Sequence, residues 1–205
     1  MKIKICGLSK SNEVVTSVNE VADFCGFILN YPKSYMNLSL AQAKILTNID
    51  KKKTKYVGVL VNPNDEEMEI FSNLNFDYFQ LYGNYYNEDI KQIKKKFGKK
   101  IISCVQVKKR EDIDNYKKIE GESDIILWDS TGFEKSLKWD FNWIKNVSTK
   151  IDKMIAGDIQ INNLNNLVNL ADIIDVSGAL ETNKVKDIDK IKRFINEIKK
   201  INYEN

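Results

Sequence analysis

Short apolar runs rich in β-branched residues alternate with amphipathic segments eight times along the chain. Each run has the length of a strand and is bounded by polar residues. Several runs, such as residues 57–61, are apolar without alternation, as expected when both faces of a parallel sheet are covered. The expected strands are residues 2–6, 24–29, 56–61, 78–81, 101–105, 124–128, 153–156 and 173–176.

The segments between these strands have the apolar spacing of amphipathic helices. The last segment shows it most clearly, because Ile188, Ile191 and Ile195 fall on one face with lysines on the opposite face. The expected helices are residues 12–21, 40–49, 66–74, 87–97, 110–119, 142–147, 162–168 and 185–201.

Eight strand–helix units have two usual arrangements, an open doubly wound sheet and a closed (β/α)8 barrel. The first strand is not followed by the GxGxxG turn of a dinucleotide-binding fold, which weakens the open-sheet alternative. The eight units leave no residual segment, and no linker or repeat array divides the chain. The sequence therefore predicts an α/β fold, a single (β/α)8 TIM barrel domain over residues 1–205.

The composition argues against several partners and locations. A net charge of +3 is too small to indicate a nucleic-acid partner. No apolar run approaches the roughly 18 residues of a membrane span, and the lysines near the first residue do not fit a signal peptide. The three cysteines, Cys6, Cys25 and Cys104, lack CxxC spacing, so neither a disulfide framework nor a zinc site is expected. These features predict a protein of the reducing cytoplasm, without a membrane partner.

The chain contains no histidine, so acid–base chemistry would fall to Cys, Asp, Glu, Lys or Tyr. In a parallel barrel the loops after the strands form the active face, and helix N-termini favour anions there. Cys6 leaves the first strand directly before Gly7, and Asp129 follows the sixth strand. These two residues are the candidates for catalysis, whereas Cys25 and Cys104 are interpreted as buried hydrophobic residues.

Six short motifs then follow one another at the expected strands. They are KICGLS at 4–9, GVLVN at 58–62, QLYG at 80–83, LWDS at 127–130, AG at 156–157, and DVS at 175–177 followed by ET and KD. In this order the motifs resemble those of the phosphoribosylanthranilate isomerase family, (β/α)8 enzymes of tryptophan biosynthesis. The resemblance spans nearly the whole chain.

The resemblance implies an Amadori rearrangement of N-(5-phosphoribosyl)anthranilate to 1-(2-carboxyphenylamino)-1-deoxyribulose 5-phosphate. A general acid would open the furanose ring and a general base would remove the C2′ proton. By resemblance, Cys6 is the base and Asp129 the acid. It also implies a monomer or homodimer that needs no cofactor and no metal. The implied substrate-binding residues are Lys33, Gln80, Gly157, Ser177 and Gly178.

Several positions depart from the family pattern, mostly where phosphate and carboxylate groups would bind. Lys33 stands where the family has an arginine, which keeps the charge but not the bidentate fork. Residues 133–137 replace a glycine-rich loop, and Asp158, Ala179 and Tyr82 replace a glycine, a glycine and a histidine.

Two other functions remain open at this point. One is a (β/α)8 enzyme that acts on another phosphorylated sugar; the absence of histidine argues against a metal-dependent epimerase of that kind. The other is a non-catalytic barrel that binds a phosphosugar, for which loss of Cys6 or Asp129 would be the expected signature. Both residues are present.

Overall fold

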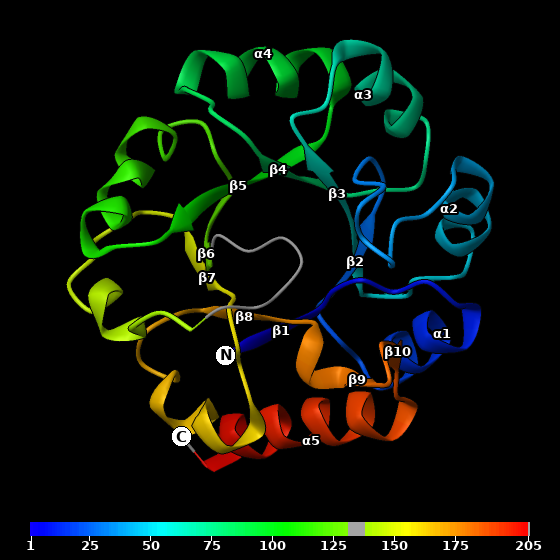
Figure 1. The fold of residues 1–205 in the computed structure, drawn as a ribbon, viewed down its shortest axis with the longest axis vertical. Helices are drawn as coiled ribbons and strands as arrows, with labels where there is room; N and C mark the ends of the chain where they lie inside the picture. The colour runs from blue at the N-terminus through cyan, green and yellow to red at the C-terminus, as the bar shows by residue number, and fades with distance from the viewer. Residues whose placement is uncertain (131–137, 205) are drawn as a thin grey trace.

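Eight parallel strands close into a barrel in chain order, so that β8 pairs with β1. The computed structural model describes residues 1–130 and 138–204. Figure 1 looks along the barrel, with the helices arranged around it. The predicted (β/α)8 fold is confirmed. The strands are β1 Lys2–Ile5, β2 Phe24–Ile28, β3 Lys55–Val61, β4 Tyr78–Tyr82, β5 Lys100–Val107, β6 Ile125–Ser130, β7 Asp152–Ile155 and β8 Ile173–Val176.

Capping side chains mark the start of two α-helices in the described chain. Ser39 accepts a hydrogen bond from the N–H of Gln42, and Asn64 accepts one from the N–H of Glu67. Both pairs form capping boxes that satisfy donors of the first turn. The α-helices are α1 Ser11–Asn19, α2 Leu40–Thr47, α3 Asp65–Ser72, α4 Asn87–Phe97 and α5 Ile188–Glu204.

Three of the expected helices are 3-10 segments instead of α-helices. They are η1 Arg110–Lys118, η2 Phe141–Ile144 and η3 Ile161–Asn166. The sequence of η3, INNLNN, shows a reason, because asparagine side chains compete with the helical hydrogen bonds of the backbone. A further 3-10 turn, η4 Gly178–Leu180, follows β8.

The expected helix at 185–201 is wrong at its start. Val185–Lys186 forms strand β10, which pairs antiparallel with β9, Glu181–Thr182. The helix begins only at Ile188, because Asp187 accepts hydrogen bonds from the N–H groups of Asp189 and Lys190. A carboxylate in that position caps a helix and fixes its first turn.

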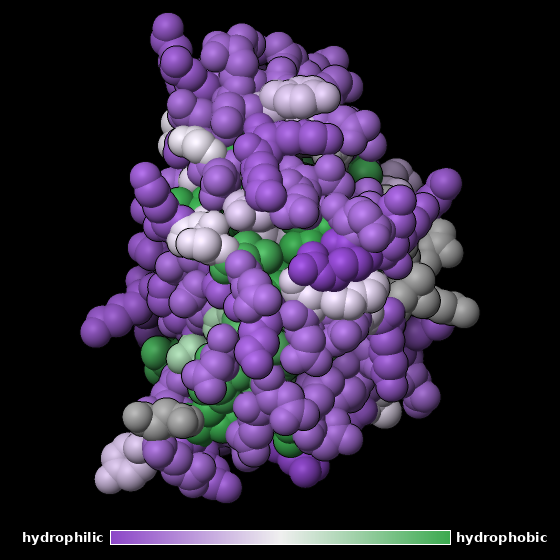
Figure 2. All heavy atoms as spheres, turned by 90° about the vertical axis from the view of Figure 1, so that its left-hand side faces the viewer, coloured by the Kyte–Doolittle hydropathy of each residue, from purple (hydrophilic) through white to green (hydrophobic). Residues whose placement is uncertain are grey.

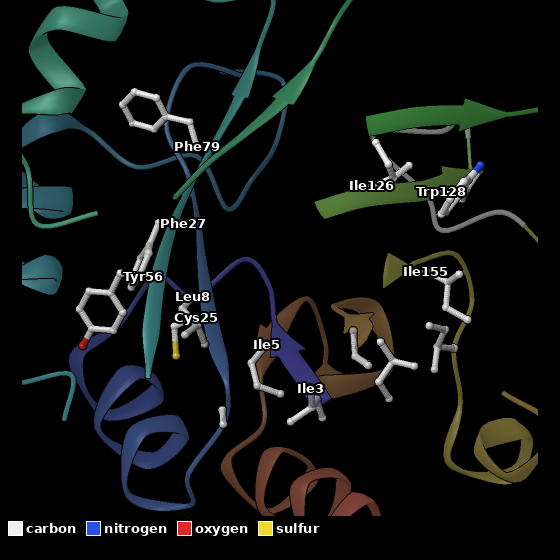
Figure 3. Packing of buried hydrophobic residues seen from close by; sticks show 14 of the residues in the cluster. Ile3, Ile5, Leu8, Cys25, Phe27, Tyr56, Phe79, Ile126, Trp128 and Ile155 are labelled. Carbon is white, nitrogen blue, oxygen red and sulfur yellow. The ribbon is translucent and has the colours of Figure 1, made fainter. Parts of the chain in front are cut away.

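Alternation along each strand divides the apolar side chains into two cores. The larger core lies between the strands and the helices and includes Ile3, Ile5, Phe27 and Trp128 (Figure 3). The smaller core fills the inside of the barrel and includes Cys6 and Tyr82. Residues on the inner face near the carboxyl ends of the strands are therefore placed to face one another.

The side of the molecule seen in Figure 2 is mostly hydrophilic, and hydrophobic atoms appear only in small gaps. Within the described ranges, no helix has the length and apolar character needed to cross a membrane. The two ends of the chain meet, since the Met1 ammonium donates to the Asn202 side chain at 2.6 Å.

Candidate active site

A pocket of about 780 Å³ opens at the carboxyl ends of the strands. It is lined by residues of β2, β3, β4, β6 and β8, by Cys6 directly after β1, and by the loops after β2, β7 and β8. The structure brings all seven predicted site residues together in its wall. They are Cys6, Lys33, Gln80, Asp129, Gly157, Ser177 and Gly178.

Cys6 lies directly after β1, and its side chain is buried at the floor of the pocket with 9% exposure. Gly7 turns the chain there with a φ of +77°, a conformation that side chains disfavour. Gly26 leaves room opposite, because an added Cβ would lie 3.0 Å from the Cys6 sulfur and 2.9 Å from the Lys4 Nζ.

Lys4 and Asp175 form a buried ion pair beside Cys6. The Lys4 Nζ lies 2.7 Å from Asp175 Oδ2, and the two residues are in register across β1 and β8. Asp175 Oδ1 is buried and has no hydrogen-bond partner within the described part of the chain, although the residue lines the pocket.

Burial raises the pKa of the Cys6 thiol, and the Asp175 charge adds to this effect. The Lys4 ammonium opposes it by favouring the thiolate, as does Lys186 more weakly. Burial also disfavours the charge of Lys4, but the neighbouring Asp175 and Cys6 outweigh that cost and raise the pKa of Lys4. A permanent positive charge thus stands beside the thiol.

Asp129 lies within β6, which runs on to Ser130, whereas the sequence placed it in the following loop. Its Oδ2 accepts a hydrogen bond of 2.6 Å from the Tyr82 hydroxyl, which in turn accepts one of 3.2 Å from Gln80 Nε2. Burial raises the pKa of Asp129 to about 6, although the hydrogen bond from Tyr82 lowers it. With that pKa, roughly a tenth of the Asp129 carboxyl groups hold a proton at pH 7.

The turn after β7 carries two residues with positive φ, Gly157 at +106° and Asp158 at +46°. The Asp158 carboxylate accepts a hydrogen bond of 2.9 Å from Gln160 Nε2. Its other oxygen lies 3.4 Å from the exposed Lys138 ammonium. These contacts offset part of the negative charge that Asp158 brings to the pocket.

The loop after β8 is tied to the β9–β10 hairpin by a buried lysine. Lys186 Nζ donates to both the carbonyl and the hydroxyl of Ser177 at 3.0 Å and to Glu181 Oε1 at 2.6 Å. The hydroxyl of Tyr35, from the loop after β2, donates to the other oxygen of Glu181. This network fixes Ser177 relative to the loop that carries Lys33.

Sequence reasoning missed Lys4, Asp175 and Lys186 as parts of this site. Lys4 had a detectable signal, because residues two apart in a strand share a face and Cys6 was already a candidate. Asp175 and Lys186 stood in quoted motifs without an assigned role. The loop residues 133–137, which lack the family's glycines, lie outside the described residues.

Comparisons with known proteins give a consistent result. The family model described as N-(5′-phosphoribosyl)anthranilate (PRA) isomerase matches residues 3–197. A Streptococcus mutans protein named N-(5′-phosphoribosyl)anthranilate isomerase is 33% identical over 202 residues, which cover 97% of this chain and 99% of that protein. The solved phosphoribosyl anthranilate isomerase of Thermotoga maritima has a TM-score of 0.84 at 26% identity, with 98% and 99% coverage.

A further solved structure is a phosphoribosyl anthranilate isomerase in complex with reduced 1-(O-carboxyphenylamino)-1-deoxyribulose 5-phosphate. It has a TM-score of 0.81 at 25% identity, and the match covers 98% of this chain and 99% of the solved one. Similarity therefore extends over the barrel as a whole rather than over one motif.

Proposed function

The chain belongs to the N-(5′-phosphoribosyl)anthranilate isomerase family, and we infer that it converts N-(5-phosphoribosyl)anthranilate to 1-(2-carboxyphenylamino)-1-deoxyribulose 5-phosphate. It is an isomerase of tryptophan biosynthesis that interconverts an aldose and a ketose. Full-length similarity to relatives with this name supports the assignment, as does the presence of a thiol and a carboxyl group in one pocket.

In the proposed mechanism, Asp129 acts first as the general acid. It gives its proton to the furanose ring oxygen, the bond from that oxygen to C1′ breaks, and the nitrogen lone pair forms an iminium. The Cys6 thiolate then removes the C2′ proton, and the electron pair of that bond neutralises the iminium to give an enolamine. Tautomerisation of the enolamine gives the C2′ ketone with no net redox change. The pKa of Asp129, about 6, suits a proton donor near neutral pH.

The proposed substrate carries two anionic groups, a carboxylate and a phosphate. In this proposal Lys33 attracts the anthranilate carboxylate, and Gly157, Ser177 and Gly178 surround the phosphate, as loops after β7 and β8 do in many barrels. Gln80 acts from β4 at the other side of the pocket. The Lys4 ammonium supports the thiolate form of Cys6.

The remaining expectations on organisation accompany this proposal. We propose that the chain works as a single domain in the cytoplasm, as a monomer or a homodimer, on a small phosphorylated substrate and without nucleic-acid or membrane partners.

The single observation that carries the proposal is that Cys6, directly after β1, and Asp129, within β6, line the same pocket. The test is the rate of ketose formation by the purified protein, followed by NMR. Cys6→Ala and Asp129→Asn should each lower kcat by at least about 10²-fold, the usual contribution of a general acid or base.

Cys25→Ala is the matched control, because Cys25 is also fully buried but faces the helices in the outer core. It should retain turnover close to that of the unmodified protein. A Cys6→Ala variant as active as Cys25→Ala would refute the base assignment, and an inactive unmodified protein would refute the function.

A further inference from the structure

Tyr82 stands between two residues of the proposed site and is itself buried, with 7% exposure. Its hydroxyl accepts a hydrogen bond from Gln80 Nε2 at 3.2 Å and donates to Asp129 Oδ2 at 2.6 Å. A phenol has one proton to donate, so these two hydrogen bonds run in one direction, from Gln80 to Tyr82 and from Tyr82 to Asp129. The other side-chain atom of Gln80, Oε1, is buried and unpaired among the described residues, which means that the amide is held in place by its N–H group.

We propose that Tyr82 is a positioning residue for the acid step, which orients the Asp129 carboxyl group through Oδ2 and stabilises the carboxylate left after proton transfer. This inference rests on the proposed function, in which Asp129 protonates the ring oxygen. The family pattern has histidine at this position, so a hydrogen bond from a phenol to Asp129 is a departure of this chain from that pattern.

The contact with Tyr82 fixes one oxygen of the carboxyl group, because Oδ2 accepts a short hydrogen bond from the phenol. A backbone hydrogen bond from Ser130 also favours the charged carboxyl group. The hydroxyl of Ser130 lies 3.5 Å from Oδ1, at the long limit for such a bond. Of these two side chains, Tyr82 therefore makes the stronger contact and orients the Asp129 carboxyl group.

The same hydrogen bond also changes the strength of the acid. Burial raises the pKa of Asp129, and the bond from Tyr82 offsets part of that rise because it favours the charged form. After proton transfer the carboxylate stays buried, and the Tyr82 hydroxyl stabilises it by donating a hydrogen bond to Oδ2. Tyr82 itself remains protonated, since burial and the Asp129 charge raise its pKa well above the usual range.

The test is Tyr82→Phe, which removes the hydroxyl and keeps the ring. In protein labelled with ¹³C at aspartate carboxyl groups, we expect the pKa of Asp129 to rise by about one unit. We expect kcat to fall about tenfold with KM little changed, because the lost interaction acts in the transition state. Tyr116→Phe is the control: it also removes a buried tyrosine's hydroxyl, one that donates to the Ser148 carbonyl outside the pocket.

Several results would overturn the inference. One is an Asp129 pKa that does not move in Tyr82→Phe; another is a rise in KM alone, which would make Tyr82 only a part of the pocket wall. If the variant does not fold, the unmodified protein provides the test. The ¹³C shift of the Tyr82 ring carbon that bears the hydroxyl should change with pH at the midpoint of Asp129, and a shift that does not follow that midpoint would overturn the inference. An active Asp129→Asn would instead refute the proposed acid itself, so the two failures are distinguishable.

Discussion

Burial governs the ionisation of both proposed catalytic residues. It raises the pKa of Cys6 and also that of Asp129, to about 6. The base must lose a proton and the acid must hold one, yet the thiol binds its proton more tightly than the carboxyl group does. Between the two pKa values the pair shares one proton, and the reactive arrangement is the minor one.

This ordering predicts the pH dependence of kcat/KM in the free enzyme. As the pH falls below about 6, a second proton binds the pair, the thiolate is lost and activity falls. As the pH rises past the raised pKa of Cys6, the last proton leaves and activity falls again. A plateau should extend between these limits. Steady-state rates from about pH 5 to about pH 10 measure it; activity that keeps increasing below pH 6 would contradict the ordering.

The ion pair of Lys4 and Asp175 predicts a stability effect. Both side chains are at most 5% exposed, so Lys4→Met leaves an uncompensated carboxylate in the barrel. That variant should lose about 3–5 kcal/mol of unfolding free energy in urea. The double variant Lys4→Met with Asp175→Asn should recover part of the loss. A single variant that unfolds at the same urea concentration as the unmodified protein would mean that the pair is not charged.

At the scale of residues, the sequence predicted seven residues that line the pocket, but it missed Asp175 and did not indicate which residues touch one another. Tyr82 and Asp129 come from β4 and β6, and side chains from alternate strands share a layer inside a barrel. The contact therefore depends on the stagger of the closed sheet, which no local pattern encodes. Lys4, in contrast, could have been predicted from the sequence, because its position two residues before Cys6 in a strand puts both side chains on the same face.

Among the elements, the turn after β1 contacts a loop that is distant in the sequence, because Gly7 packs against Met36. Gly7 has a φ of +77° and Gly98, which ends α4, has a φ of +66°. An added Cβ at Gly7 would lie 2.3 Å from Met36 Sδ, whereas nothing lies within 4 Å at Gly98. Met36 in turn lies against the Ser177 hydroxyl and the Lys186 ammonium.

The two glycines therefore form a matched pair of substitutions. Gly98→Ala and Gly7→Ala should each cost about 1 kcal/mol of stability for the left-handed backbone. Only Gly7→Ala should also raise KM, because it displaces Met36 toward Ser177. Urea unfolding and steady-state kinetics on both variants check this. Equal KM values in the two variants would show that Met36 does not transmit the change.

The elements were predicted best where periodicity is strong. All eight barrel strands were placed within two residues at each end, because continuous apolar runs have few alternative readings. The choice of 3-10 over α-helix in η1, η2 and η3 has no such periodic signal, because η1 and η3 are mostly polar and η2 has only four residues. Strand β10 was predicted as the start of the last helix because Val185 fits the apolar spacing of α5.

For the whole molecule, barrel closure is what creates the site. Residues as distant in the chain as Cys6 and Ser177 meet because β1 pairs with β8 and all strands point the same way. The order of the motifs therefore predicted one pocket, since each motif ends a strand at the same face. The closed sheet also leaves no barrel strand with an unpaired edge.

The most direct measurement of the central claim is growth without tryptophan of a bacterium that lacks its own phosphoribosylanthranilate isomerase. Plasmids would supply the unmodified chain, Cys25→Ala or Cys6→Ala, at matched levels of folded protein. The account predicts growth with the first two and none with Cys6→Ala. Failure of the unmodified chain to support growth, or growth with Cys6→Ala equal to that with Cys25→Ala, would contradict it.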